Sequence, residues 1–416
     1  TNACIADWEM TQVWELLMAC DANRGGIYQT YVNSFEWTLE LYKSANEGMC
    51  AVITGDGGNK AACGSRFGCG ICTVNGQRDK SVEAMIDSEP DKFGYLAGIN
   101  RLRNFLVRTQ HDFSRRDWLQ RSVSEIGYVA LSPDTYSPQM RRELFRYMVT
   151  LDVLEQERAD DHAGALANGE IEDTEHNRRL AHPQFEWVTP KVALSVDFAW
   201  SLLGCFPYAF PALREWHEIR NFGKRYYVPD VGENEYPRRS VPEKRYFYVG
   251  AFEHAWKADG LRNVVGEAVN SSRRPGKPPF GAYQDPDTGE TRRVTYFEEA
   301  SELEVDAFEA SMFALEFEDL YVETLNMDVR SGLFYLLDRG IVKIGRGQIG
   351  SYDRIARRSQ FWQRLQEQWN VESLEKGIMD ASISQAEHFG KLEEFKQQKV
   401  EAEVPHEQNL ELDLFG

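Results

Sequence analysis

Four cysteines lie close together in the sequence and are the residues best suited to chemistry. They are Cys50, Cys63, Cys69 and Cys72, and they fall within 23 residues. Cysteine thiolates bind soft metals, and one metal centre must draw several of them from a backbone that folds tightly around it. Glycine supplies that backbone freedom at Gly64, Gly68 and Gly70. The spacing therefore predicts a metal centre held by these four thiolates.

Three interpretations of this cysteine segment stay open. A [4Fe–4S] cluster comes first, because four cysteine thiolates are its usual ligands. A zinc site comes second, although zinc commonly uses two short cysteine pairs and this segment has one, Cys69 and Cys72. Unligated or redox-active thiols come third. The remaining cysteines, Cys4, Cys20 and Cys205, stand in apolar surroundings and are expected to be buried and inert.

The stretch from Cys63 to Thr73, with Arg78-Asp79-Lys80-Ser81 after it, resembles the DndC family of DNA phosphorothioation proteins. That family belongs to the phosphoadenosine-phosphosulfate (PAPS) reductase-like superfamily. The stretches Asp7–Trp14, Leu102–Asn104 and Tyr136–Leu144 are also similar. The resemblance covers about residues 5–158, and Gly70 stands where the family usually has Trp.

The resemblance implies an enzyme, an iron–sulfur sulfurtransferase that incorporates sulfur into the DNA backbone. It implies that the family's four cluster ligands correspond to Cys50, Cys63, Cys69 and Cys72. Its partners would be a cysteine desulfurase and the other phosphorothioation proteins, with DNA as the substrate. The family uses ATP through a PP-loop, Ser-Gly-Gly-x-Asp-Ser, which this sequence lacks. ATP and Mg²⁺ are therefore expected only if a PP-loop domain exists upstream.

Two other functions remain open at this point. One is a non-catalytic scaffold in DNA defence, in which a structural four-cysteine metal site holds a loop together. The other is a PAPS reductase-like enzyme that acts on a small sulfonucleotide. That enzyme would need a reductant-linked cysteine near a C-terminus, and the sequence has none after Cys205.

The charge distribution bears on DNA binding. The net charge of −19 argues against a protein that coats nucleic acid, because phosphate contacts need a cationic face. Residues 91–146 reverse the balance, with ten lysines and arginines against six acids. The candidate phosphate or DNA contacts are Arg66, Arg101, Arg108, Arg115 and Arg116. The alternative is that the arginines on these helices form a solvated face with ion pairs.

Periodicity predicts a mainly α fold with small β elements. We expect it to be the iron–sulfur-bearing helical part of a PAPS reductase-like (adenine nucleotide α-hydrolase-like) protein, with the α/β PP-loop core upstream or absent from this chain. Helices are expected over 7–46, 92–122, 138–158, 190–222, 300–338 and 351–399, and short strands at 224–229 and 244–251. Ser137-Pro138 is typical of a helix start.

The same patterns divide the chain into eight regions. They are a helical end of the PAPS reductase-like core (1–48), the four-cysteine loop (49–90), a helical region with a basic face (91–158), an acidic linker (159–189), a helix with short strands (190–265), a Pro/Gly-rich loop (266–299), a C-terminal helical region (300–395) and a tail (396–416).

The sequence also gives expectations for the C-terminal tail and for the cellular location of the protein. Leu412, Leu414 and Phe415 resemble the peptide with which bacterial proteins dock on the DNA sliding clamp, although the tail could also pack on its own domain. No apolar run approaches the roughly 18–20 residues of a membrane span. Residues 1–30 lack the basic start and the following apolar stretch that are typical of a secretory signal. A cytoplasmic protein with no membrane partner is therefore expected.

Overall fold

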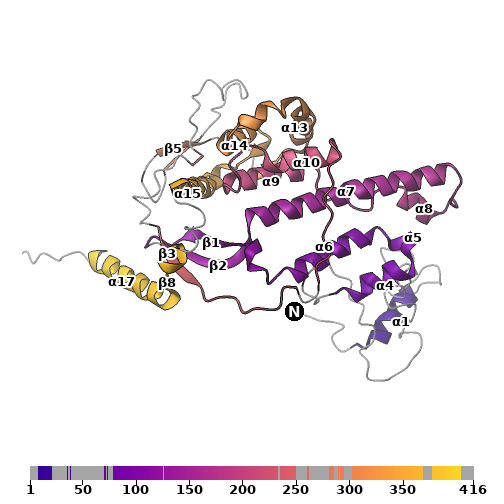
Figure 1. The fold of residues 1–416 in the computed structure, drawn as a ribbon, viewed down its shortest axis with the longest axis horizontal. Coiled ribbons are helices and arrows are strands. Elements are labelled where there is room, and N and C mark those ends of the chain that lie inside the picture. Colours follow the sequence, from indigo (N-terminus) through magenta and orange to yellow (C-terminus); the bar gives the residue numbers. More distant parts are fainter. Residues whose placement is uncertain are drawn as a thin grey trace, which may run out of the picture. The chain divides into compact units, whose positions relative to one another are not determined.

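The computed structural model describes residues 8–20, 78–124, 126–232, 235–249, 302–368 and 377–403, with short pieces at 35, 38, 70–71, 73, 260–261, 281–284, 289 and 291–294. It is mainly helical with small antiparallel sheets, as the sequence predicts (Figure 1). Two compact units divide the chain. Unit 1 comprises Thr1–Asp112, Thr150–Glu186 and Tyr226–Arg238, and unit 2 comprises Phe113–Val149, Trp187–Arg225 and Arg239–Gly416. None of the helices in the described ranges is both long and apolar enough to cross a membrane.

Unit 1 is helical in the part that the structure describes. Its helices are α1 (Met10–Cys20), α4 (Lys80–Ser88), α5 (Pro90–Phe93), α6 (Leu96–Arg108), the later part of α7 (Pro138–Ala167) and α8 (Glu175–Leu180). The carboxylate of Asp79 caps α4 by accepting a hydrogen bond from the amide of Val82 at 3.2 Å. A Cβ added at Gly98 would overlap with the side chain of Leu151. This glycine therefore permits a close approach of α6 to α7.

Unit 2 contains an antiparallel four-stranded sheet. Its strands are β1 (Arg116–Val123), β2 (Tyr128–Tyr136), β3 (Arg245–Tyr248) and β8 (Ile383–Ser384), in the order β1-β2-β3-β8. Val129 of β2 pairs with Phe247 of β3, and both are buried. Buried cross-strand pairs of this kind fix the register, because a slip of one residue would turn them toward solvent.

The other elements of unit 2 are mostly helices. They are η2 (Phe113–Arg115), the first part of α7, α9 (Pro190–Leu202), α10 (Pro211–Arg220), α13 (Ala307–Leu320), η3 (Glu323–Asn326), α14 (Val329–Asp338), η4 (Arg346–Gln348), α15 (Ile349–Gln368) and α17 (Gln385–Glu403). Two short antiparallel pairs accompany them. They are β4 (Gly281–Gln284) with β5 (Thr291–Val294), and β6 (Glu304–Val305) with β7 (Val342–Lys343).

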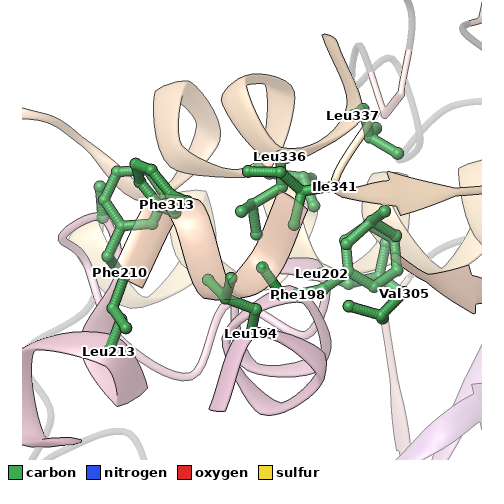
Figure 2. Close-up of a cluster of buried hydrophobic side chains, with 14 of the residues drawn as sticks. Leu194, Phe198, Leu202, Phe210, Leu213, Val305, Phe313, Leu336, Leu337 and Ile341 are labelled. Carbon is green, nitrogen blue, oxygen red and sulfur yellow. The ribbon is translucent and has the colours of Figure 1, made fainter. Parts of the chain in front are cut away.

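The hydrophobic core of unit 2 forms around α9. This helix packs against α10, α13, α14 and α15. Figure 2 shows side chains of α9, α10, α13 and α14 meeting in one cluster, with Leu194 and Phe198 of α9 close to residues of α13 and α14. The cluster is almost fully buried, and Leu194, Leu213 and Leu336 have no exposed surface. Burial of these apolar side chains is the main stabilising contribution to this unit.

A buried carboxyl group joins α9 to α10. Asp197 has no exposed surface and accepts hydrogen bonds from the amides of Ala212 at 2.8 Å and Leu213 at 2.7 Å. These amides lie in the first turn of α10, where backbone N–H groups lack partners within the helix. Phe210, just before that turn, has φ of 52°. This left-handed conformation costs residues other than glycine about 1 kcal/mol or more. Contacts of its ring with Phe313, Phe317 and Tyr335 offset that cost.

The structure confirms some sequence expectations about elements. Helix α7 begins at Pro138, and the Ser137 hydroxyl accepts from the amide of Met140 at 3.2 Å. A strand lies within 244–251, as β3. The helical expectations over 190–222 and 300–338 hold for α9, α10, α13 and α14, with breaks between them.

Other expectations about elements were wrong. The helix expected over 92–122 ends at Arg108, and β1 takes its last residues because they pair with β2. Helix α7 continues to Ala167, inside the expected acidic linker, and α8 follows it there. No strand forms at 224–229. The hairpin β4–β5 stands in the region expected to be a Pro/Gly-rich loop.

We expect Leu336→Ala to destabilise the protein by about 2–5 kcal/mol, because it leaves a cavity in the core around α9. Leu315→Ala is the matched control, since Leu315 is 73% exposed and its truncation should change stability by less than about 0.5 kcal/mol. Denaturant unfolding measures both variants. Equal effects of the two substitutions would contradict this description of the core.

Asp197 predicts a pH dependence of stability. Burial raises its pKa from 3.8 to about 7, against the opposing effect of the amides of Ala212 and Leu213. Between these two pH values the folded protein keeps a proton that the unfolded chain releases. Stability is therefore greatest at the acid end and falls as the pH rises toward 7, with a slope of up to about 1.4 kcal/mol per pH unit. Above about pH 7 this contribution no longer changes.

The measurement is thermal unfolding of the wild type and Asp197→Asn at pH 5, 6, 7 and 8. Asparagine cannot titrate, so the advantage of the wild type should shrink as the pH rises. A difference in Tm that stays constant over this range would show that Asp197 keeps an ordinary pKa.

Candidate functional site

The four cysteines of the expected metal centre, Cys50, Cys63, Cys69 and Cys72, lie outside the described residues. Arg66 and the tail residues Leu412, Leu414 and Phe415 do as well. Their roles therefore remain predictions. As a donor set, four thiols fit an iron–sulfur cluster or zinc by their chemistry.

One residue of the cysteine loop, Gly70, lies against helix α6 within unit 1. A Cβ added at Gly70 would lie 3.0 Å from Cγ2 of Ile99 on α6. That distance is tighter than ordinary van der Waals contact, so a larger side chain at this position would require Ile99 to move. The glycine that stands between Cys69 and Cys72 is thus suited to a close contact with α6.

Helix α6 carries two of the candidate arginines. Arg108 is partly buried, and its guanidinium donates to Asp230 Oδ1 at 2.9 Å and to the carbonyl of Val231 at 2.5 Å. Arg101 is exposed and has no ion pair within the described ranges. Arg108 therefore ties α6 to the segment around Asp230, whereas the charge of Arg101 is available to a ligand.

A polar pocket lies beside these arginines. It is formed by α4, α6 and the segment Pro229–Val231, and its volume is about 330 Å³. Asn100 lines it and is 9% exposed, and its Oδ1 has no hydrogen-bond partner in the described part of the chain. Asn104 also lines it and accepts a hydrogen bond from Arg103 at 2.9 Å. Neither asparagine was among the predicted site residues, although Asn100, Asn104 and Arg108 repeat at helical spacing.

The other two candidate arginines belong to unit 2. The guanidinium of Arg115 lies 2.6 Å from Glu143 Oε2 and 3.7 Å from the sulfur of Met140. Arg116 places its guanidinium carbon 4.2 Å from the ring centroid of Tyr136, a cation–π contact. These contacts match the alternative in which the basic residues form intramolecular pairs.

Glu215 neutralises a further part of the basic region. Its carboxylate oxygens lie 2.6 Å from the guanidinium groups of Arg142 and Arg146, and the side chain of Glu215 is 4% exposed. Burial raises the pKa of Tyr208 beside this cluster. The cluster joins α7 to α10 within unit 2.

The remaining described cysteines differ from each other. Cys20 is buried, as expected. Cys205 is half-buried, and its sulfur lies 3.4 Å from the guanidinium of Arg141. The surroundings of Cys205 are thus more polar than the sequence suggested. Among the residues that the structure describes, no group of three or more His, Cys, Asp or Glu side chains could hold a metal ion.

Comparison of the chain with protein-family models, with curated proteins and with solved structures finds no significant match.

The two arginines of α6 predict different effects on stability. We expect Arg108→Gln to destabilise the protein by about 1–2 kcal/mol, because its bonds to Asp230 and to the Val231 carbonyl are lost. Arg101→Gln should change stability by less than about 0.5 kcal/mol. Denaturant unfolding compares the two variants. If Arg101→Gln were the more destabilising change, Arg101 would have a structural role and not a ligand-binding one.

Proposed function

We propose that this chain is the iron–sulfur component of a sulfurtransferase that incorporates sulfur into the DNA backbone. The observation that carries the proposal is the segment from Cys63 to Thr73, which places three cysteines among glycines, with Cys50 upstream. Four thiolates are the ligands that a [4Fe–4S] cluster requires. The family that this segment resembles performs DNA phosphorothioation.

The roles of the cysteines follow from their chemistry. Cys50, Cys63, Cys69 and Cys72 would hold the cluster as deprotonated thiolates. A cluster of this type can bind or relay sulfur, or it can order the surrounding loop. Amides of the glycine-rich backbone would donate hydrogen bonds to the cluster sulfurs, and Arg66 would offset part of the negative charge.

Two features of the described residues next to this loop support the proposal. Gly70 lies against Ile99 of α6, and Arg101 follows on the same helix with its charge exposed. A guanidinium group in that place is suited to a DNA phosphate, because it offers several donors in one plane. Because the net charge of the chain is −19, contacts with DNA would have to be made by a locally basic part of its surface.

The complete reaction requires further components. A cysteine desulfurase would supply the sulfur, and a PP-loop domain would supply ATP activation, in line with the family that the cysteine segment resembles. The PAPS reductase-like fold is likewise proposed from this resemblance. A zinc-bound scaffold for DNA-defence proteins is the competing function, and metal analysis distinguishes it from an iron–sulfur enzyme.

Metal analysis after anaerobic purification tests the proposal. We expect about four irons and a similar amount of acid-labile sulfide per chain, consistent with one [4Fe–4S] cluster. Cys69→Ser should lower both, because serine is a poor ligand for soft metals. Cys205→Ser is the matched control and should retain both, since Cys205 lies outside the quartet. Stoichiometric zinc without sulfide would favour the scaffold.

Sulfur incorporation tests the activity. Radioactive sulfur supplied as cysteine should enter DNA when this protein acts, in the presence of ATP, together with a cysteine desulfurase and the partner phosphorothioation proteins, including a PP-loop component. The Cys69→Ser variant should abolish incorporation and Cys205→Ser should preserve it. Full incorporation with Cys69→Ser would contradict a role of the quartet in the reaction.

A further inference from the structure

The pocket between α4, α6 and Pro229–Val231 is of ligand size. Its volume of about 330 Å³ lies at the lower end of the range for small-molecule sites, which begins near 300 Å³. We propose that this pocket binds a single deoxynucleotide, with the phosphate at Arg101 and the exocyclic amino group of the base at Asn100. The choice of a deoxynucleotide as the ligand rests on the proposed function. The pocket is observed independently of that function.

Asn100 supplies the first reason. This residue is only 9% exposed, and no group in the described residues donates a hydrogen bond to its Oδ1. A buried acceptor without a partner costs stability, so such groups usually serve a ligand or hold a water molecule. A ligand N–H group that enters the pocket would satisfy this oxygen. The amide of asparagine is also the usual reader of adenine in nucleic-acid recognition.

The charges of the pocket supply the second reason. Arg78 is held by Glu83 at 2.8 Å, and Arg108 is held by Asp230 at 2.9 Å. Arg101 lines the same pocket and has no such partner in the described ranges. Among the described residues, the pocket therefore offers one guanidinium group without an ion-pair partner, alongside the carboxylate of Asp87. An anionic group with several oxygens, such as a phosphate, is its natural partner.

The remaining lining predicts a preference among bases. Asp87 lines the pocket with an exposed carboxylate, so both Asp87 and Asn100 present acceptors. Adenine, cytosine and guanine carry an exocyclic amino group that can donate to them, whereas thymine presents carbonyl acceptors in its place. Ile86, Ala97 and Phe105 add apolar surface. The pocket should therefore favour the three amino-bearing bases over thymine.

The position of the pocket connects it with the cysteine loop. Asn100 follows Ile99, the residue of α6 that lies against Gly70. A nucleotide bound to Asn100 and Arg101 would thus be held by the same helix that contacts the loop. Under the proposed function, this arrangement would present one nucleotide of the DNA substrate to that region of the protein.

Isothermal titration with the four deoxynucleoside 5′-monophosphates tests the inference on the full chain. We expect dAMP, dCMP and dGMP to bind about tenfold more tightly than dTMP, since thymine has no exocyclic amino group to donate to Asn100. Arg101→Gln should weaken all four by about tenfold, because the loss concerns the shared phosphate. Arg178→Gln is the matched control, since Arg178 is a surface arginine paired with Asp173 and should leave binding unchanged.

Asn100→Leu separates a binding role from a structural one. Leucine has a similar volume and no polar atom, so the variant should keep or raise the Tm of the unliganded protein. It should nevertheless weaken the preference for amino-bearing bases, with Asp87 as the acceptor that remains. A merely structural asparagine would show the opposite, with a lowered Tm and unchanged nucleotide selectivity.

Three results would overturn the inference. They are the absence of saturable binding by any of the four nucleotides, binding that is unaffected by Arg101→Gln, and equal affinity for inorganic phosphate and dAMP, which would mark a simple anion site. Iron and sulfide are measured in the same samples. Failed nucleotide binding with a normal cluster rejects the pocket alone, and normal nucleotide binding without iron rejects the proposed function alone.

Discussion

The buried carboxyl group of Asp197 fixes the first turn of α10 on α9, and the packing of unit 2 depends on that link. The two amides that it accepts from have no partner within their own helix, so the carboxyl group satisfies them where water is excluded. Once α10 is placed, Phe210 reaches Phe313, Phe317 and Tyr335, and α13 and α14 close over α9. Apolar burial supplies most of the stability, and this polar contact gives the packing its orientation.

Unit 1 shows how the same physical rules leave a place for a ligand. In α6 the buried side chains Leu102 and Phe105 secure the helix, and Arg108 ties it to Asp230. Asn100 and Arg101 lack such partners in the described residues. An unsatisfied buried acceptor is usually accounted for by a bound water molecule or by a functional ligand. Within α6, a polar side chain that is bonded to another part of the protein has a structural role. One without such a partner in the described residues is suited to binding a ligand.

The sequence predicted the elements whose signals are local. Ser137 and Pro138 mark the start of α7 because a cap and a fixed φ act within one turn. It failed at β1, whose pairing with β2 depends on a sheet that also requires β3, more than 100 residues later in the chain. It also failed at residues 159–167, where acidic composition suggested a linker although four alanines and Leu166 favour a helix. The pocket of Asn100 was missed because burial of a single polar atom is a tertiary property.

Differential alkylation followed by mass spectrometry tests most directly whether the four thiolates converge on one inorganic centre. In the protein as isolated anaerobically, Cys50, Cys63, Cys69 and Cys72 should all resist a thiol reagent, and removal of the metal should make all four reactive together. Cys205 provides an internal reference, since its half-buried thiol should react to the same extent before and after metal removal. Four cysteines that react independently, or with the same rates in both states, would contradict a shared centre.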